Sequence, residues 1–196
     1  MQNRAMIFID GANLISGWRA YCLKKGHFDK VTDKITQKLD YEKLISLLTT
    51  QIKETELIRA YFFDGLMEND PKKGKFLDKL RSLEMSLVTS MNKTKTKTCP
   101  HCKKIFAFDV QKGVDVSLAT YVLGLAFEDA YDIAIIVSGD GDYEQAIKFI
   151  KNKGKNVWVV AFRGSLSADL WKCADKIVEL DSHFEKLRMS DGSSFK

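Results

Sequence analysis

The sequence predicts an α/β fold, in which a parallel sheet of about five to six strands carries helices on both faces. Short apolar runs alternate along the chain with longer segments whose apolar residues recur at helical spacing. The most apolar run, residues 131–137, is what a central parallel strand buried on both faces requires. No succession of hairpins and no internal repeat interrupts this alternation, which favours a parallel sheet.

The first part of the chain predicts one strand and two helices. Residues 5–10 are apolar, end in an acid and precede the turn residues 11–13, so they predict a buried strand. A helix is expected next as far as Lys25, followed by a polar loop to Thr36. Apolar residues at helical spacing then predict an amphipathic helix over residues 41–48.

The middle of the chain continues the pattern and is then interrupted. Strands are expected at residues 57–63 and 86–91, with a helix between them that begins at Pro71, because proline is favoured at the first helical position. Residues 92–113 are rich in lysine and threonine and predict an inserted loop or small hairpin. Regular apolar spacing then predicts a helix over residues 116–127.

After the central strand, the same alternation closes a single domain over residues 1–181, and a polar C-terminal tail is expected over residues 182–196. The remaining elements expected in this domain are a helix over residues 143–153, a strand over 156–161, a short helix over 166–172 and a short strand over 177–178.

Composition limits the class of protein. A chain of 196 residues suits one domain with a substantial core. No apolar run approaches the ~20 residues of a membrane helix, and no signal peptide precedes the first strand, so a cytoplasmic protein with no membrane partner is expected. The net charge of +5 permits a polyanionic partner without requiring one. Lysines gather in the insert between Lys93 and Lys104, where they would either contact such a partner or form a solvated face.

Acidic residues recur where the predicted strands end. Asp10 ends the first strand, Asp140 and Asp142 follow the central strand, and Asp115 opens the helix that leads into that strand. Sites in open α/β sheets form outside the carboxyl ends of the strands, so these acids are expected to meet there. Carboxylates brought together repel one another unless a cation neutralises them, and their hard oxygen atoms suit Mg²⁺ or Mn²⁺. Such a cluster, with lysines around it, predicts phosphodiester hydrolysis.

Each acid also has a structural interpretation. Asp115 can be a first-turn acid favoured by the helix dipole, and Asp142 with Gln145 resembles a capping box. Asp140, between two glycines in a tight strand-to-helix turn, is the hardest to explain structurally. Asp64 also ends a predicted strand, but the structural interpretation is favoured for it, so it stays outside the predicted site.

Three segments carry a resemblance to a known family: Ile7–Leu14 (IFIDGANL), Lys112–Asp115 (KGVD) and Ser138–Tyr143 (SGDGDY). In order, spacing and strand–loop context, they resemble the three motifs of the NYN domain, a branch of the PIN-like nuclease superfamily, and within it the LabA-like proteins. The resemblance covers roughly residues 6–180. The three motifs together are specific, whereas any one alone would be weak.

The resemblance implies a Rossmann-like, PIN-like sheet and an RNA-cleaving activity that depends on Mg²⁺ or Mn²⁺, with single-stranded RNA as the expected partner. It also implies that Asn13 holds a ligand or a phosphate through its amide, and that Ser138 orients a carboxylate or a water molecule. The motif acids, which would be catalytic and would hold the ion, fall on Asp10, Asp115, Asp140 and Asp142.

Cys99 and Cys102 form a C-x-x-C pair inside the insert. The pair resembles one half of a structural zinc site, which needs four ligands. The candidates to complete it are Cys22, Cys173, His27, His101 or a second copy of the chain, as in a homodimer. A plain reduced pair is an open alternative, whereas a thioredoxin-like redox pair is disfavoured, since the motif does not lie between a strand and the start of a helix.

The sequence also bears on three functions other than that of a ribonuclease. The main alternative is a non-catalytic RNA- or nucleotide-binding module of the same fold. A phosphatase of the haloacid dehalogenase type needs a second acid two residues after the strand-end aspartate, where Ala12 stands. A dinucleotide-dependent oxidoreductase is disfavoured because no G-x-G-x-x-G follows the first strand. Tyr143 is expected either in the core or stacked on an unpaired base.

Overall fold

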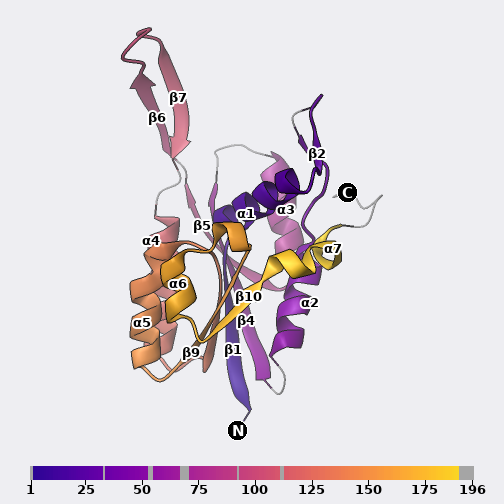
Figure 1. Cartoon of the computed structure of the whole chain (residues 1–196). Helices are drawn as coiled ribbons and strands as arrows, with labels where there is room; N and C mark the ends of the chain where they lie inside the picture. Colours follow the sequence, from indigo (N-terminus) through magenta and orange to yellow (C-terminus); the bar gives the residue numbers. More distant parts are fainter. Residues whose placement is uncertain are drawn as a thin grey trace.

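The computed structural model describes residues 2–32, 34–52, 55–66, 71–91, 93–110 and 113–189. A parallel sheet of six strands, in the order β10-β9-β8-β1-β4-β5, forms its centre (Figure 1). This architecture confirms the predicted α/β fold class. The strands are β1 (Asn3–Asp10), β4 (Thr55–Leu66), β5 (Met85–Met91), β8 (Ile133–Val137), β9 (Asn156–Ala161) and β10 (Lys176–Glu179).

Helices cover both faces of the sheet, and each face has its own apolar core. In β1, Ile7 and Ile9 belong to one core, whereas Met6 and Phe8 belong to the other, because successive strand residues point to opposite faces. The first core is covered by α1 (Gly11–Lys24), α2 (Tyr41–Gln51), α3 (Pro71–Ser82) and α7 (Phe184–Leu187), and the second by α4 (Val114–Phe127), α5 (Glu144–Asn152) and α6 (Ala168–Cys173).

The strand order creates a switch point between β1 and β8. From β1 the chain adds β4 and β5 on one side, and it later adds β8, β9 and β10 on the other. The loops after β1 and β8 therefore lead into helices on opposite faces of the sheet, namely α1 and α5. A crevice opens outside the carboxyl ends of strands at such a point, and ligand sites of open α/β sheets lie there.

Three segments differ from the sequence-based expectation or make it more specific. The stretch expected as a polar loop contains a small hairpin of β2 (Phe28–Asp29) and β3 (Lys34–Ile35). The insert is a hairpin of β6 (Lys93–Thr98) and β7 (Ile105–Val110), which projects away from the sheet (Figure 1). The interpretation of residues 182–196 as a tail is wrong as far as residue 187, because Phe184 and Leu187 are buried in the core.

Among the described residues, no helix combines the length and the apolar character needed to cross a membrane.

Candidate active site

Asp10 lies at the carboxyl end of β1, and its side chain is almost completely buried. One carboxylate oxygen, Oδ1, accepts a hydrogen bond of 3.0 Å from the backbone N–H of Asn13, so Asp10 caps α1. The other oxygen, Oδ2, accepts hydrogen bonds from the hydroxyls of Ser138 (3.3 Å) and Tyr143 (3.1 Å). The carboxylate is therefore held in a fixed orientation at the switch point.

Tyr143 joins Asp10 to Asp115. Its ring is buried, and its hydroxyl lies 3.1 Å from Oδ2 of Asp10 and 3.5 Å from Oδ1 of Asp115. Because a hydroxyl has one hydrogen to donate, the shorter contact with Asp10 takes it most of the time. Burial raises the pKa of Tyr143, and the charges of Asp10, Asp115 and Asp140 raise it further. Tyr143 therefore stays protonated and acts as a hydrogen-bond donor.

The electrostatic environment of Asp10 favours a nearby cation. Burial raises the pKa of Asp10, and the negative charge of Asp115 acts in the same direction. Hydrogen bonds from Asn13, Tyr143 and Ser138 oppose this rise. A buried carboxylate beside a second one is costly while both are ionised, and a positive ion between them would remove that cost.

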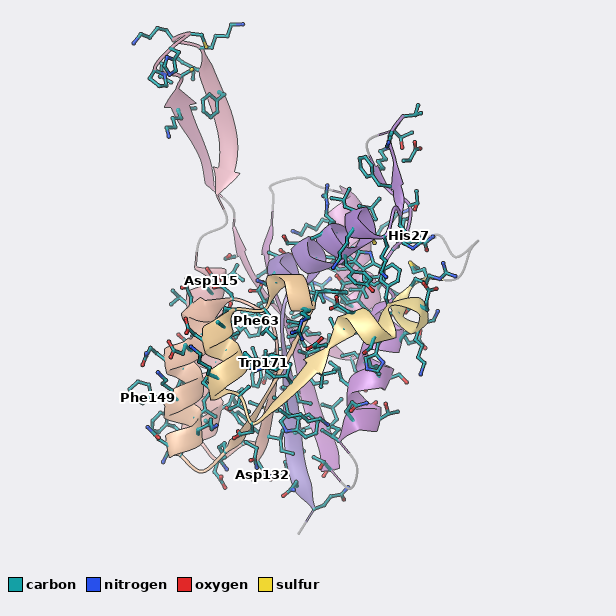
Figure 2. All side chains as sticks on the ribbon, viewed as in Figure 1. His27, Phe63, Asp115, Asp132, Phe149 and Trp171 are labelled. Carbon is teal, nitrogen blue, oxygen red and sulfur yellow. The ribbon has the colours of Figure 1, made fainter. Side chains whose placement is uncertain are left out.

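Asp115 stands in the first turn of α4, which begins after Gly113 in a left-handed conformation (φ +82°). Its side chain is exposed, and its Oδ1 lies 3.5 Å from the hydroxyl of Tyr143. Figure 2 shows Asp115 at the end of the sheet from which the β6–β7 hairpin extends, whereas Asp132 lies at the opposite end. Lys112, which belongs to the same sequence motif, lies outside the described residues.

The loop after β8 is tied to the loop after β1. The hydroxyl of Ser138 donates to Asp10 and accepts a hydrogen bond of 3.2 Å from the backbone N–H of Asp140. The side-chain oxygen of Asn13 accepts a hydrogen bond of 2.9 Å from the backbone N–H of Gly139. Ser138 thus orients a carboxylate, whereas the amide oxygen of Asn13 is engaged by the backbone and positions the loop.

Gly139 makes this arrangement possible because it allows a close backbone approach. A Cβ atom at this position would lie 2.1 Å from the carbonyl oxygen of Ser165, so only glycine fits. The backbone N–H of Ser167 in turn donates to the carbonyl oxygen of Gly139 over 2.9 Å. The loop after β8 is consequently packed from both sides.

Asp140 and Asp142 have different surroundings. The half-buried Asp140 caps a 3₁₀ turn, η1 (Gly141–Tyr143), by accepting a hydrogen bond of 3.1 Å from the backbone N–H of Asp142. The side chain of Asp142 is exposed. Helix α5 begins at Glu144 with Tyr143 as its N-cap residue and no side-chain cap, so the capping box considered for Asp142 and Gln145 does not form. Within the described residues, no contact joins the carboxylate of Asp142 to those of Asp10 and Asp115.

Asp64 lies apart from this group. Its side chain forms an ion pair of 2.9 Å with Lys73, and its charge acts on Tyr41. Tyr41 belongs to the core on the opposite face of the sheet from Tyr143. The ion pair with Lys73 therefore supports the structural interpretation of Asp64.

The carboxylates of the site supply the hard oxygen ligands that a divalent cation such as Mg²⁺ needs. Among the described residues, no three His, Cys, Asp or Glu side chains form a ready metal site. Two carboxylates, Asp10 and Asp115, share one hydroxyl, and a third, Asp140, is close enough to act on the same hydroxyl. Mg²⁺ is commonly held by one or two carboxylates, with water and substrate phosphate as the other ligands, so the residues fit such an ion.

The C-x-x-C pair lies at the turn of the β6–β7 hairpin. The backbone N–H groups of Cys102 and His101 lower the pKa of Cys99 by hydrogen bonding to its sulfur. Cys22 and Cys173 are buried in the two separate cores, and the ring of His27 stacks on Phe184. The expectation that Cys22, Cys173 or His27 completes a zinc site with the pair is therefore wrong.

Sequence reasoning did not assign Tyr143 to the site. The signal was its position directly after the Ser138–Asp142 segment, which begins the turn leading into α5. A tyrosine at this position also fits a core residue. Tyr143 has both roles, because its ring fills the core and its hydroxyl reaches the carboxylates.

Comparisons with known proteins found a family model, a curated relative and a solved structure that this chain is similar to. A model of the NYN domain matches residues 4–181 of the chain. The chain is 26% identical over 179 residues to the "Low amplitude and bright protein LabA" of Synechococcus elongatus, covering 91% of this chain and 84% of that protein. It also resembles the crystal structure of a protein of unknown function from Vibrio parahaemolyticus, with a TM-score of 0.68, 22% identity and coverage of 96% and 97% of the two chains. The last comparison concerns the fold alone.

Proposed function

The chain belongs to the NYN domain family, a PIN-like nuclease family, and from this membership we propose that it is a ribonuclease that hydrolyses RNA phosphodiester bonds with a carboxylate-bound Mg²⁺ or Mn²⁺. NYN domains generally act on nucleic acid and use divalent metals, which supports the proposal. The observation that carries it is the buried Asp10 at the switch point, which shares the hydroxyl of Tyr143 with Asp115.

Asp10 and Asp115 are the proposed ligands of the ion. A bound Mg²⁺ or Mn²⁺ would neutralise charge on the scissile phosphate and lower the pKa of an attacking water molecule. Asp10 is held for this task by Ser138, Tyr143 and the backbone of Asn13, so its free oxygen lone pairs point in a fixed direction. Asp115 is exposed, which leaves it open to substrate.

Asp140 and Asp142 have supporting roles in this proposal. Asp140 keeps the loop after β8 in place through its cap on η1 and contributes negative charge near Tyr143. The exposed Asp142 lies on the rim, where it would contact the ion through water or meet the substrate. Asn13 positions the loop through Gly139 and is in place to meet a phosphate only through its amide nitrogen.

The β6–β7 hairpin is the proposed contact for the RNA backbone. It leaves the sheet after β5 and returns at α4, the helix that carries Asp115, so it extends from the same end as the carboxylates. Lys97, Lys103 and Lys104 are exposed on it. Lysine side chains that neutralise phosphates would give affinity with little dependence on base sequence.

The proposal is tested by incubating the protein with short single-stranded RNA in Mg²⁺, Mn²⁺ and EDTA, while RNA binding is measured in parallel. We expect cleavage with either ion and none with EDTA. Binding without cleavage in both ions would contradict the proposal and favour the alternative, an RNA-binding module of the same fold.

A further inference from the structure

A tight turn, residues 99–104, joins β6 to β7 and contains both Cys99 and Cys102. The backbone N–H of Lys103 donates to the carbonyl oxygen of Cys99 over 3.0 Å, and that of Cys99 donates to the carbonyl oxygen of Lys104 over 2.9 Å. Lys103 adopts a left-handed conformation (φ +59°), which is uncommon for a residue other than glycine. This tight turn holds Cys99 and Cys102 between the paired strands β6 and β7, at the tip of the hairpin.

Such a turn prepares two thiolates for one metal ion. Two cysteines with two residues between them have the spacing of zinc ligands in structural sites, and the thiolate is the form that binds metal. Both cysteines are accessible, since Cys99 is half-buried and Cys102 is exposed. Thiolates are ligands that Zn²⁺ commonly takes, but a closed structural zinc site needs four ligands, and this turn supplies two.

The chain cannot supply the other two ligands from its remaining cysteines and histidines. It has four cysteines and three histidines in all, and every one lies in the described residues. Cys22 and Cys173 are buried beneath helices of the main domain, and His27 packs on Phe184. His183 ends η3 (Leu180–His183), a turn between β10 and α7 in the main domain. Within the described part of the chain, no third Cys, His, Asp or Glu joins Cys99 and Cys102. His101 lies inside the turn itself.

We propose that Cys99 and Cys102 of two copies of the chain bind one Zn²⁺ ion, joining the hairpins tip to tip in a zinc-bridged homodimer. Four thiols would lose their protons to solvent as the tetrahedral site forms. The hairpin projects away from the main domain, so its tip is accessible to a second copy (Figure 1).

Charge and apolar surface at the tip support a second copy as the partner. A Zn²⁺ ion with four thiolates has a net charge of about −2. The exposed Lys103 and Lys104 from each of two copies would surround that charge with cations. Directly after them, Ile105 is 72% exposed and Phe106 is 48% exposed. A contact between two hairpin tips would cover these apolar side chains.

The experiment measures zinc content and solution mass of the full chain, purified in reducing buffer without added chelator. We expect about 0.5 zinc ion per chain and a mass twice that of one chain. Removing the metal with a strong chelator should return the monomer, and adding Zn²⁺ alone should restore the dimer. A zinc-free protein, or a monomer that binds one zinc ion per chain, would contradict the proposal.

Two variants make the test specific. Replacing both ligands, Cys99→Ser with Cys102→Ser, should abolish zinc binding and dimer formation while the melting temperature of the main domain stays unchanged. The matched control is His101→Ala, which alters the same turn but removes no proposed ligand and should retain both properties. Loss of zinc in His101→Ala would overturn the four-thiolate site. The proposal does not rest on the ribonuclease activity, because neither readout measures cleavage.

Discussion

The hydroxyl of Tyr143 donates a hydrogen bond of 3.1 Å to Oδ2 of Asp10. These two residues are 133 positions apart, and they meet because β1 and β8 are neighbours whose following loops turn to opposite faces. The contact fixes the carboxylate that we propose as a metal ligand, and it connects a core side chain with the chemistry of the site.

Replacing Tyr143 with phenylalanine should reduce cleavage and metal affinity by about 10- to 100-fold, the usual effect of losing a group that orients a metal ligand. The control is Tyr131→Phe, which removes another buried hydroxyl, bonded to the carbonyl oxygen of Val122 at 2.7 Å and outside the site. Each variant should lose about 1 kcal/mol of unfolding free energy. Equal cleavage by Tyr143→Phe and Tyr131→Phe would show that the Tyr143 hydroxyl serves only the core.

Gly139→Ala should destabilise the protein, because the new Cβ atom would lie 2.1 Å from the backbone oxygen of Ser165. We expect a loss of about 3 kcal/mol in urea unfolding, together with loss of cleavage as the loop after β8 shifts. Gly164→Ala is the matched control, since a Cβ there would meet open space. It should change stability by no more than about 0.5 kcal/mol. A normal melting temperature for Gly139→Ala would disprove the close packing of this loop.

The ion pair between Arg4 and Asp132, at the other end of the sheet, should make the stability of the fold sensitive to acid. Hydrogen bonding to Arg4 lowers the pKa of Asp132 from 3.8 to about 2, with Arg4 and Lys155 adding attraction. A carboxyl whose pKa is lower in the folded state stabilises the fold above its ordinary pKa, and that contribution is lost as the pH falls from about 4 towards 2. Asp132→Asn should therefore cost on the order of 1 kcal/mol at pH 7, after allowance for solvent screening.

This cost should become much smaller near pH 2, where about half of the wild-type carboxyls in the folded state are neutral. Urea unfolding of both proteins from pH 7 to pH 2 measures the difference. A gap between the two proteins that stays constant over this range would contradict the assignment to Asp132.

Lysines of the hairpin should contribute to RNA binding through charge. Replacing Lys93, Lys95 and Lys97 together with glutamine should weaken binding at low salt and reduce the slope of log affinity against log salt by up to about 2 for single-stranded RNA. Lys148→Gln is the control, because Lys148 is already paired with Glu144 on α5. If the triple variant has the same affinity and slope as the control, the hairpin is a solvated face.

Much of the fold could be predicted from local patterns. The apolar run at residues 131–137 and the helical spacing in α4 depend on neighbours in the sequence, and the structure has a strand, β8 (Ile133–Val137), and the helix in place. The role of Phe184 and Leu187 in the core could not be predicted, because a four-residue helix gives no periodic signal and its burial depends on contacts with distant elements.

The position of the site could be predicted from the sequence, whereas the roles of its single residues could be predicted only in part. Strand-end acids indicate the edge of the sheet, and Asp10 and Asp115 do approach one hydroxyl. The difference between a capping role for Asp140 and an exposed Asp142 depends on the path of one turn, which residue types alone do not determine. The hydrogen bond from the backbone N–H of Gly139 to the amide oxygen of Asn13 likewise depends on how two loops pack.

The most direct test of the central claim is the Mn²⁺-dependent cleavage rate of single-stranded RNA by Asp10→Asn. The control is Asp78→Asn, the same chemical change at an exposed aspartate whose ion pair, within the described residues, is with Arg81 on α3. We predict that Asp10→Asn falls to the rate seen in EDTA while it still binds RNA and folds, and that Asp78→Asn cleaves like wild type. Cleavage by Asp10→Asn at the wild-type rate would contradict a metal site built on Asp10.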